Sequence, residues 1–320
     1  EQGYGSLTAE DVNVREDTAP VFKKLSRDIE RIYPEIFNAR TKSDVGIVYS
    51  YENSWGTPGW VVDGFYDEEF FNMYGGFQNA LRANVDVCSI EDDLTKYKLL
   101  LLPNYKIITD EQKEKIEKYV RDGGTIVINS ECGTLDEFAK TRVMLRPGLF
   151  ADIAGAVVSG EITADEFKKQ TGADCFVDFC GEKRNLTSKI HRLKLLGAEK
   201  IAEFFGGKLS GLPAVTVNGY GNGKCILYAC DGNDVLFYEA LARAVNSHCE
   251  ISPLVPSSDD GILFASRETD SGCYLFAVNM KESEQSFALF GGGTELISGK
   301  EVSDRVTLRG YETAVIRIVR

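Results

Sequence analysis

The first half of the chain alternates short apolar runs with longer amphipathic segments. Residues 98–103 (KLLLLP) are almost continuously apolar, as expected of a strand that is buried on both faces of a parallel sheet. Residues 109–122 repeat apolar positions at helical spacing, with Thr109 and Gln112 placed for a capping box and two glycines following. This alternation predicts βαβ units and a parallel sheet. The other elements predicted here are strands at 44–51, 85–90 and 125–129 and a helix at 66–83.

The segment before these units has its own helical pattern. Apolar side chains recur at helical spacing over residues 18–39, so one face of the predicted helix is apolar. Pro20 suits the first turn of this helix, whereas Pro34 is expected to kink or interrupt it. We therefore expect residues 1–43 to form a lead-in segment that contains a packing helix.

The pattern is less regular after residue 131. Apolar spacing predicts helical stretches at 145–153 and 194–204. A glycine-rich turn at 218–223 then separates two strand-like runs, which indicates a hairpin. The strands of this hairpin are predicted at 212–217 and 223–230, and a helix at 234–246 closes an open α/β domain that spans 44–249.

From about residue 250 the chain consists of short alternating runs at close spacing. Pro253 and Pro256, with two serines after them, mark a linker into this region. Alternating runs separated by turn residues predict an antiparallel β sandwich or barrel of about six strands over residues 250–320. The predicted strands lie at 262–267, 273–279, 286–290, 294–297, 305–308 and 313–318.

Composition narrows the classes of partner. A chain of 320 residues is long enough for about two domains, at roughly 100–200 residues each. Its 49 acidic and 36 basic residues give a net charge of −13, which a nucleic acid or an anionic membrane surface would repel. No apolar run approaches the roughly 18 residues of a membrane span. We therefore expect no nucleic-acid and no membrane partner.

The eight cysteines indicate buried, reduced thiols in a cytoplasmic protein. They form no C-x-x-C pair, most lie in strand-like runs, and a disulfide framework is unexpected in a chain of this length. The only histidines, His191 and His248, are not spaced with a cysteine as zinc ligands are. Gly219, Gly221 and Gly223 have the wrong spacing for a phosphate loop. The sequence therefore predicts no metal and no cofactor.

Three places at the ends of predicted strands carry candidate chemistry, because open α/β sheets bind ligands at the carboxyl ends of their strands. The first is Cys132, which follows a strand and precedes a glycine, as the nucleophile of class I glutamine amidotransferases does. Such a thiolate needs a base, and neither His191 nor His248 lies in the His-x-Glu pattern of those enzymes. A spare thiol in a loop is the simpler interpretation.

The second place holds the carboxylates of Glu131, Asp136 and Glu137. Two carboxylates about 5–5.5 Å apart can hydrolyse a glycoside with retention, but closeness in sequence does not establish that separation. Solvated or capping carboxylates are the favoured interpretation.

The third place is a polar loop with aromatic residues after the first strand. Aromatic side chains in such a loop can stack on a sugar or anchor an interface, and we favour an interface. The candidate residues are Glu52, Asn53, Trp55 and Trp60.

An ordered series of motifs resembles the glycoside hydrolase family 42 β-galactosidases. The resemblance covers the chain from about residue 15 to its end and begins with the segment VGIVYSYENSW. No single motif is decisive, but their order is fairly specific. The matching segments are 45–55, 93–99, 102–103, 119–125, 133–137, 146–150, 211–215 and the turn at 221–223.

The resemblance implies a non-catalytic oligomerisation portion. Members of the family carry both catalytic glutamates in a preceding TIM barrel that this sequence lacks, so no catalytic residue is carried over. The chain begins with Glu1 instead of methionine, and we expect it to be cut from a longer polypeptide. The family's middle domain is flavodoxin-like, related to the class I glutamine amidotransferase fold, and builds a trimer, for which the loop from Glu52 to Trp60 is a candidate contact surface. The parent would hydrolyse terminal β-galactosides with retention.

A second interpretation stays open at this point. The chain could be a stand-alone amidotransferase-like enzyme, or a sugar-binding protein, that uses a strand-end site around Glu131 and Cys132. Fold alone does not separate the two, because one fold can serve many functions.

Overall fold

The computed structural model describes residues 18–56, 66–232, 234–270 and 272–318. They divide into two compact units: an α/β unit within Ser43–Pro253, and a β unit in which residues 18–42 belong together with the described residues from Leu254 to Ile318. Of the helices in these ranges, none combines the length and the apolarity that crossing a bilayer requires.

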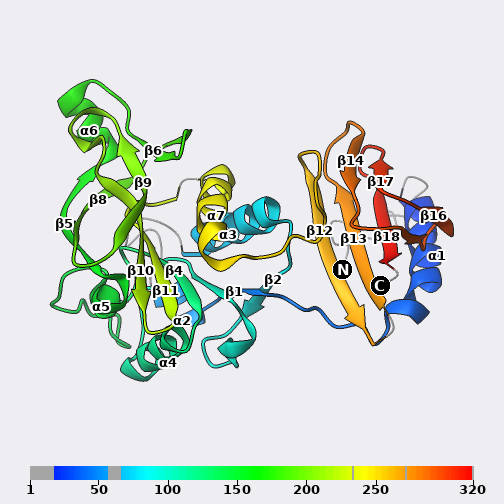
Figure 1. Ribbon diagram of the computed structural model, residues 1–320, viewed down its shortest axis with the longest axis horizontal. Coiled ribbons are helices and arrows are strands. Elements are labelled where there is room, and N and C mark those ends of the chain that lie inside the picture. Colours follow the sequence, from blue (N-terminus) through cyan, green and yellow to red (C-terminus); the bar gives the residue numbers. More distant parts are fainter. Residues whose placement is uncertain (1–17, 57–65, 233, 271, 319–320) are drawn as a thin grey trace, which may run out of the picture. The chain divides into compact units, whose positions relative to one another are not determined.

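A nine-stranded sheet forms the centre of the α/β unit (Figure 1), in the order β2-β1-β3-β4-β11-β10-β9-β6-β7. The first five strands of this order are parallel, and the remaining four continue the sheet antiparallel. The sheet that was predicted to be open and parallel is therefore mixed, with antiparallel strands that begin at the predicted hairpin. Its strands are β1 (Val45–Val48), β2 (Val85–Cys88), β3 (Leu99–Leu102), β4 (Thr125–Asn129), β6 (Phe176–Phe179), β7 (Glu182–Asn185), β9 (Glu199–Phe205), β10 (Pro213–Tyr220) and β11 (Gly223–Tyr228).

Two hydrophobic cores cover the two faces of this sheet. In β3, Leu99 and Leu101 point into one core, whereas Leu100 and Leu102 point into the other. All four are fully buried, which explains why this strand is apolar throughout. The helices are α2 (Tyr51–Gly56), α3 (Tyr66–Leu81), α4 (Asp110–Arg121), α5 (Ala151–Ala154), α6 (Ala164–Thr171) and α7 (Val235–Cys249), with short 3-10 turns at Leu94–Lys96, Gly148–Phe150 and Gly207–Leu209.

Helices α3 and α7 lie side by side on one face of the sheet, and α4 contributes to the other core (Figure 1). The predicted capping box of α4 is present, since Thr109 accepts from the backbone of Gln112 and the Gln112 side chain accepts from the backbone of Thr109. A separate two-stranded sheet pairs β5 (Ala156–Thr163) with β8 (Lys189–Leu195).

Several predicted elements were wrong. Residues 194–204 are not helical: β8 ends at Leu195, Gly197 has a positive φ of 147°, and β9 follows. In β9, Ala202 and Phe204 are buried at every second position, so its true period is two. Residues 51–56, expected as a loop, form α2. The helical stretch at 145–153 is reduced to a 3-10 turn followed by α5.

The β unit contains a five-stranded antiparallel sheet in the order β12-β13-β18-β15-β16 and a two-stranded sheet of β14 and β17. Side chains from both sheets share one core that includes Phe264, Leu275, Phe287 and Ile316. β16 was not predicted. The strands are β12 (Ile262–Thr269), β13 (Gly272–Asn279), β14 (Gln285–Ala288), β15 (Gly293–Glu295), β16 (Lys300–Val302), β17 (Arg305–Leu308) and β18 (Thr313–Ile318).

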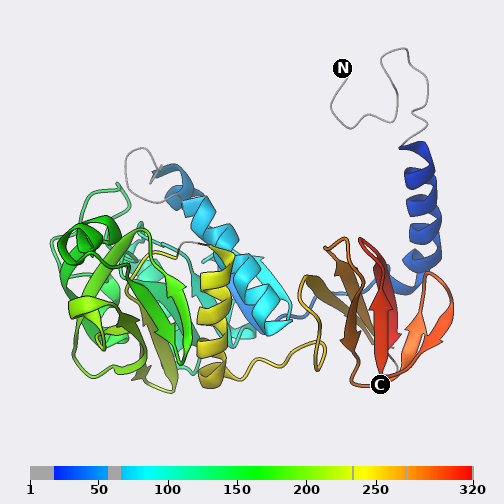
Figure 2. The same cartoon turned by 90° about the horizontal axis from the view of Figure 1, so that it is seen from above.

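Helix α1 (Ala19–Ile36) belongs to the β unit (Figure 2). Ile32 and Ile36 pack against the outer face of the five-stranded sheet, and Glu35 pairs with Arg317 at 3.1 Å. The helix continues through Pro34, where an interruption was predicted. Pro34 lies in the last turn, so it removes only one of the final backbone hydrogen bonds.

A buried carboxyl group connects α3 to the sheet. Glu69 accepts hydrogen bonds from the hydroxyl of Tyr228 at 2.6 Å and from the amide of Asn129 at 3.2 Å. Burial raises the pKa of Glu69 to about 7. The folded state therefore holds a proton here that the unfolded chain releases near the ordinary pKa of a glutamate.

The first prediction concerns the spacing of α3 and α7. A Cβ atom on Gly76 would lie 2.4 Å from the Cβ of Tyr238, whereas one on Gly75 would lie 3.7 Å from Val235. We expect Gly76→Ala to lower the free energy of unfolding by about 1–3 kcal/mol through overpacking. Gly75→Ala, the matched control, should raise it by about 0.5–1 kcal/mol through helix propensity. Urea denaturation measures both, and equal effects would contradict the close approach.

The second prediction concerns Glu69. Because its folded pKa is raised, its contribution to stability is lost as the pH rises from the unfolded pKa through about 7. Glu69→Gln should therefore match the wild type near pH 4.5 and become more stable than it by up to about 3 kcal/mol at pH 8. The exposed neighbour supplies a control, since Glu68→Gln should show no such trend. Urea denaturation from pH 4.5 to 8 measures the difference, and a difference that does not change with pH would contradict the protonated carboxyl.

Candidate functional site

The carboxyl edge of the parallel strands carries a buried polar cluster. Asn129 ends β4, and its side-chain oxygen accepts from the backbone N–H of Glu131 at 3.1 Å and from the thiol of Cys132 at 3.2 Å. Its amide nitrogen donates to Glu69 in the opposite direction. One amide thereby fixes the backbone path out of the strand and the position of both predicted site residues.

Cys132 is a structural thiol. It is fully buried, and besides Asn129 its sulfur donates to the backbone carbonyl of Leu102 at 3.3 Å. Burial raises the pKa of Cys132 to about 12, so the thiolate hardly forms at neutral pH. Among the described residues, no histidine forms a hydrogen bond with it. The arrangement lacks the base that an amidotransferase-like nucleophile needs.

Glu131 is the centre of a charged network. Its carboxylate lies 2.5 Å from Arg146 and 3.6 Å from the ammonium group of the buried Lys106. Arg146 also pairs with Glu161 at 2.6 Å, and its Nη1 lies 3.0 Å from Nε2 of His191. The network thus joins the loop after β4 to both strands of the β5–β8 pair, where His191 and Glu161 are directly opposite.

His191 stays neutral in this network. The side chain is almost completely buried, and its burial lowers the pKa more than the nearby carboxylate of Glu131 raises it. Its Nδ1 atom makes no hydrogen bond with any of the described residues. The ring therefore serves as a packed polar contact between Glu131 and Glu161, at 3.6 Å and 3.1 Å from them.

Three of these side chains could in principle hold a metal ion. One ligand atom from each of Glu131, Glu161 and His191 lies within 4.8 Å of the others. Nη1 of Arg146, however, lies 2.5, 2.6 and 3.0 Å from those same atoms. The guanidinium group supplies the positive charge where a metal ion would bind, so the geometry fits an ion-pair network better than a metal site.

Of the other two predicted carboxylates, Asp136 stabilises a turn. Asp136 accepts from the backbone N–H groups of Phe138 at 3.0 Å and of Lys140 at 2.8 Å. Among the described residues, Asp136 forms no hydrogen bond or ion pair with the network around Glu131, and Glu137 is exposed. Asp136 thus has a structural role in its turn, and the contacts of these carboxylates with the described residues do not resemble a hydrolytic pair.

The candidates after the first strand divide into a buried and an exposed part. Asn53 is buried and exchanges two hydrogen bonds with the backbone of Ile107, at 2.8 and 2.9 Å, which fastens α2 to the loop after β3. Trp55 is 76% exposed, and its ring lies against that of Tyr51. Glu52 accepts from Ser50 at 2.9 Å and is exposed. Trp60 lies outside the described residues.

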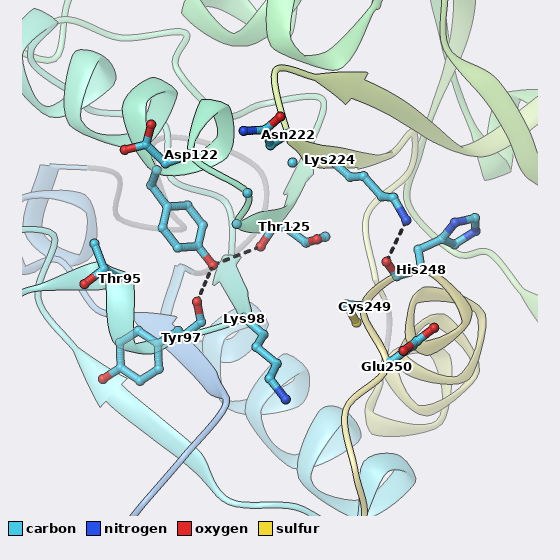
Figure 3. A pocket seen from close by; sticks show the side chains of 14 residues that line it. Thr95, Tyr97, Lys98, Asp122, Thr125, Asn222, Lys224, His248, Cys249 and Glu250 are labelled. Atoms are coloured by element: carbon cyan, nitrogen blue, oxygen red, sulfur yellow. Dashed lines mark hydrogen bonds between the residues drawn. The ribbon is translucent and has the colours of Figure 1, made fainter.

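A hollow lies at the opposite, amino edge of the sheet (Figure 3). It has a volume of about 500 Å³, and Lys224 reaches across it to the backbone carbonyl of His248 at 2.9 Å. Helices α4 and α7 both end here, at Asp122 and Glu250. Helix carboxyl ends carry partial negative charge, which disfavours phosphate and other anionic ligands. Sequence reasoning had not identified this hollow.

Comparisons with known proteins divide the chain in the same way. Residues 43–252 match the family described as β-galactosidase trimerisation domain, and residues 261–317 match that described as β-galactosidase C-terminal domain. The β-galactosidase BgaA of Planococcus sp. (strain 'SOS Orange') is 26% identical over 299 residues, which are 89% of this chain and 42% of that protein. BgaB of Geobacillus sp. (strain Y412MC61) is 27% identical over 88% of this chain and 42% of its own length.

Solved structures show the same fold. The β-galactosidase from Bacillus circulans sp. alkalophilus superposes with a TM-score of 0.83 at 21% identity, covering 98% of this chain and 47% of that one. Gan42B, a GH42 β-galactosidase from G. stearothermophilus, gives 0.86 at 20% identity over 99% of this chain and 46% of its own. The chain thus spans less than half the length of these relatives. It belongs to the glycoside hydrolase family 42 β-galactosidases, of which it contains the trimerisation domain and the C-terminal domain.

Proposed function

We propose that this chain is the assembly-forming portion of a longer β-galactosidase and has no hydrolytic activity of its own. The match of residues 43–252 to a trimerisation domain is the observation that carries the proposal. The chain corresponds to about 42% of the β-galactosidases it resembles, so the remainder of their length is available for a catalytic barrel. In this proposal the barrel hydrolyses terminal β-galactosides with retention, through two carboxylates that the present chain does not supply.

The exposed apolar residues of helix α1 support the proposal that this chain is part of a longer protein. None of its described residues is fully buried, and its apolar residues Val21, Phe22, Leu25 and Ile29 are exposed. Only the later part of the helix packs on its own unit, through Ile32 and Ile36. An amphipathic helix normally buries its apolar face, so the exposed part of α1 fits a contact with the rest of a longer protein.

The finer assignment of the fold is also a proposal. The parallel strands follow the order β2-β1-β3-β4-β11, which is the 2-1-3-4-5 order of flavodoxin-like sheets and supports a relation to amidotransferase-like domains. We propose 44–249 as the trimerisation domain and 250–320 as the C-terminal β-sandwich domain. Five of the eight cysteines, Cys88, Cys132, Cys175, Cys225 and Cys230, are buried thiols, which supports a reducing, cytoplasmic location.

The alternative of a stand-alone amidotransferase-like enzyme or sugar-binding protein is not favoured. Cys132 is buried without a base, and Glu131 is paired with Arg146 and Lys106. Both residues of the strand-end site are therefore used within the protein.

The third prediction tests the proposed function directly. Light scattering over a concentration series should give the mass of a trimer for the whole chain, and an aryl β-galactoside assay on the same sample should show no turnover. Mutation of Glu131 to Gln in a parallel sample controls for contaminating hydrolase, because a contaminant's activity would be unchanged. Turnover that disappears in Glu131→Gln would contradict the absence of activity, and a monomer at all concentrations would contradict assembly by this chain.

The fourth prediction tests the role of Cys132. Native protein treated with iodoacetamide at pH 7.5 should be alkylated at the exposed Cys180, whereas Cys132 should react only after unfolding. Peptide mass spectrometry over time measures both rates in one sample. Modification of Cys132 as fast as Cys180 would mean that the thiol is accessible and ionised, as an amidotransferase-like nucleophile would be.

A further inference from the structure

Three consecutive apolar residues at the carboxyl edge are exposed although the backbone around them is held in place. Val143 is fully exposed, Leu145 is 62% exposed, and Met144 between them is also exposed. Arg142 precedes them and Arg146 follows them. A flexible loop could turn such side chains inward. The contacts of the two arginines therefore show whether the backbone holds these side chains in their exposed position.

Both arginines are anchored in the α/β unit. Arg142 donates to the backbone carbonyls of Ile108 at 3.0 Å and Leu135 at 3.4 Å, and lies 3.2 Å from Asp110. Arg146 is held by its contacts with Glu131 and Glu161. Backbone hydrogen bonds from Met144 to Arg142 and from Gly148 to Leu145 complete the loop. The apolar side chains are therefore presented to solvent by a fixed scaffold.

Further exposed aromatic residues lie along the same edge. Phe138, 72% exposed, stands on the turn that Asp136 closes, with Lys140 above its ring. Tyr51 and Trp55 are on α2. We call Tyr51, Trp55, Phe138, Val143, Met144 and Leu145 the carboxyl-edge apolar surface.

A series of hydrogen bonds, bridges and close contacts connects the segments that carry the two parts of this surface. Asn53 of α2 is bonded to the backbone of Ile107, and Gly56 approaches the side chain of Ile107 so closely that a Cβ there would clash at 2.5 Å. Ile107 in turn forms a bridge with Leu135, which bridges to Thr141. Helix α2, the loop after β3 and the loop after β4 are thus neighbouring segments of one edge.

The distribution of charge indicates which kind of partner can bind to this surface. The chain carries a net charge of −13, so two copies repel each other over most of their surfaces. The carboxyl-edge apolar surface itself carries no charge, and the arginines beside Val143–Leu145 are already paired with Asp110, Glu131 and Glu161. Exposed charges of both signs lie beside it, in Glu52, Glu137 and Lys140, so this apolar and preorganised surface is where one acidic copy can approach another at reduced electrostatic and entropic cost.

We infer that the carboxyl-edge apolar surface is the contact through which one copy of this chain binds the next. This inference rests on the proposed function and specifies which part of the trimerisation domain performs it. In a closed ring of three, each copy contributes this surface to one neighbour and receives the other neighbour on a different surface. One altered surface therefore weakens every contact of the ring.

The fifth prediction tests the surface with matched substitutions. Val143→Glu combined with Leu145→Glu should weaken assembly of the whole chain by about 100-fold or more, because both side chains lie in the proposed contact. The control is Leu196→Glu, which places one such negative charge at a leucine of 58% exposure in the turn between β8 and β9, away from this edge. Light scattering from low to high micromolar concentration gives the dissociation constants, and circular dichroism verifies that each variant is folded.

The possible results separate this inference from the proposed function. We expect the wild type and the Leu196→Glu variant to be trimers and the Val143→Glu/Leu145→Glu variant to be a monomer. If all three proteins are trimers of equal strength, the surface is wrong although the proposed function stands. If the wild type is a monomer throughout, both fail.

A measurement on the unaltered chain covers the case in which the double variant does not fold. Amide hydrogen exchange of residues 136–145 should slow at least about threefold when the wild type is concentrated from monomer to trimer, since the loop becomes buried. Exchange at 196–198 should remain the same. Unchanged exchange at 136–145 in the trimer would overturn the inference.

Discussion

The pairing of Arg146 with Glu131 is the interaction on which the carboxyl edge of the α/β unit depends. Glu131 is nearly excluded from water, and an unpaired carboxylate in such a place would cost several kcal/mol. Arg146 neutralises it and at the same time binds Glu161, so the loop after β4 and the β5–β8 pair are held by one side chain. The residue immediately before Arg146 is the exposed Leu145, and the same ion pair therefore fixes the position of part of the outer surface.

The sequence predicted those elements whose own residues determine their structure. Residues 99–102 and 125–129 could be identified as buried strands because both faces of the parallel sheet are covered, which makes 99–102 apolar throughout and leaves polar residues only at the two ends of 125–129. The start of α4 was predictable because its capping box is formed by residues three positions apart. The hairpin of β10 and β11 was predicted for the same reason, since its turn is local.

Elements that depend on distant partners were not predictable. The apolar residues at 199–205 fit either the 3.6-residue period of a helix or the two-residue period of a strand. The segment forms a strand because β10 and β6 pair with it on its two sides. Residues 51–56 look like a polar loop, but Asn53 is drawn into the interior by the backbone of Ile107, 54 residues away. The candidate site shows the same limit. Glu131 and Cys132 were identified from the strand end, whereas Arg146, Glu161 and His191 come from other segments and no spacing connects them.

The division of the chain into units also determines when each can be completed. The α/β unit is one continuous stretch with its own two cores, so every partner it needs is synthesised before residue 254. Helix α1 emerges earlier, yet Arg317, the partner of its Glu35, lies 282 residues further along the chain. A contact of such long range forms late, whether the chain folds during synthesis or afterwards. Of the two units, the β unit has its helix α1 synthesised before the α/β unit, but it can be completed only after the α/β unit.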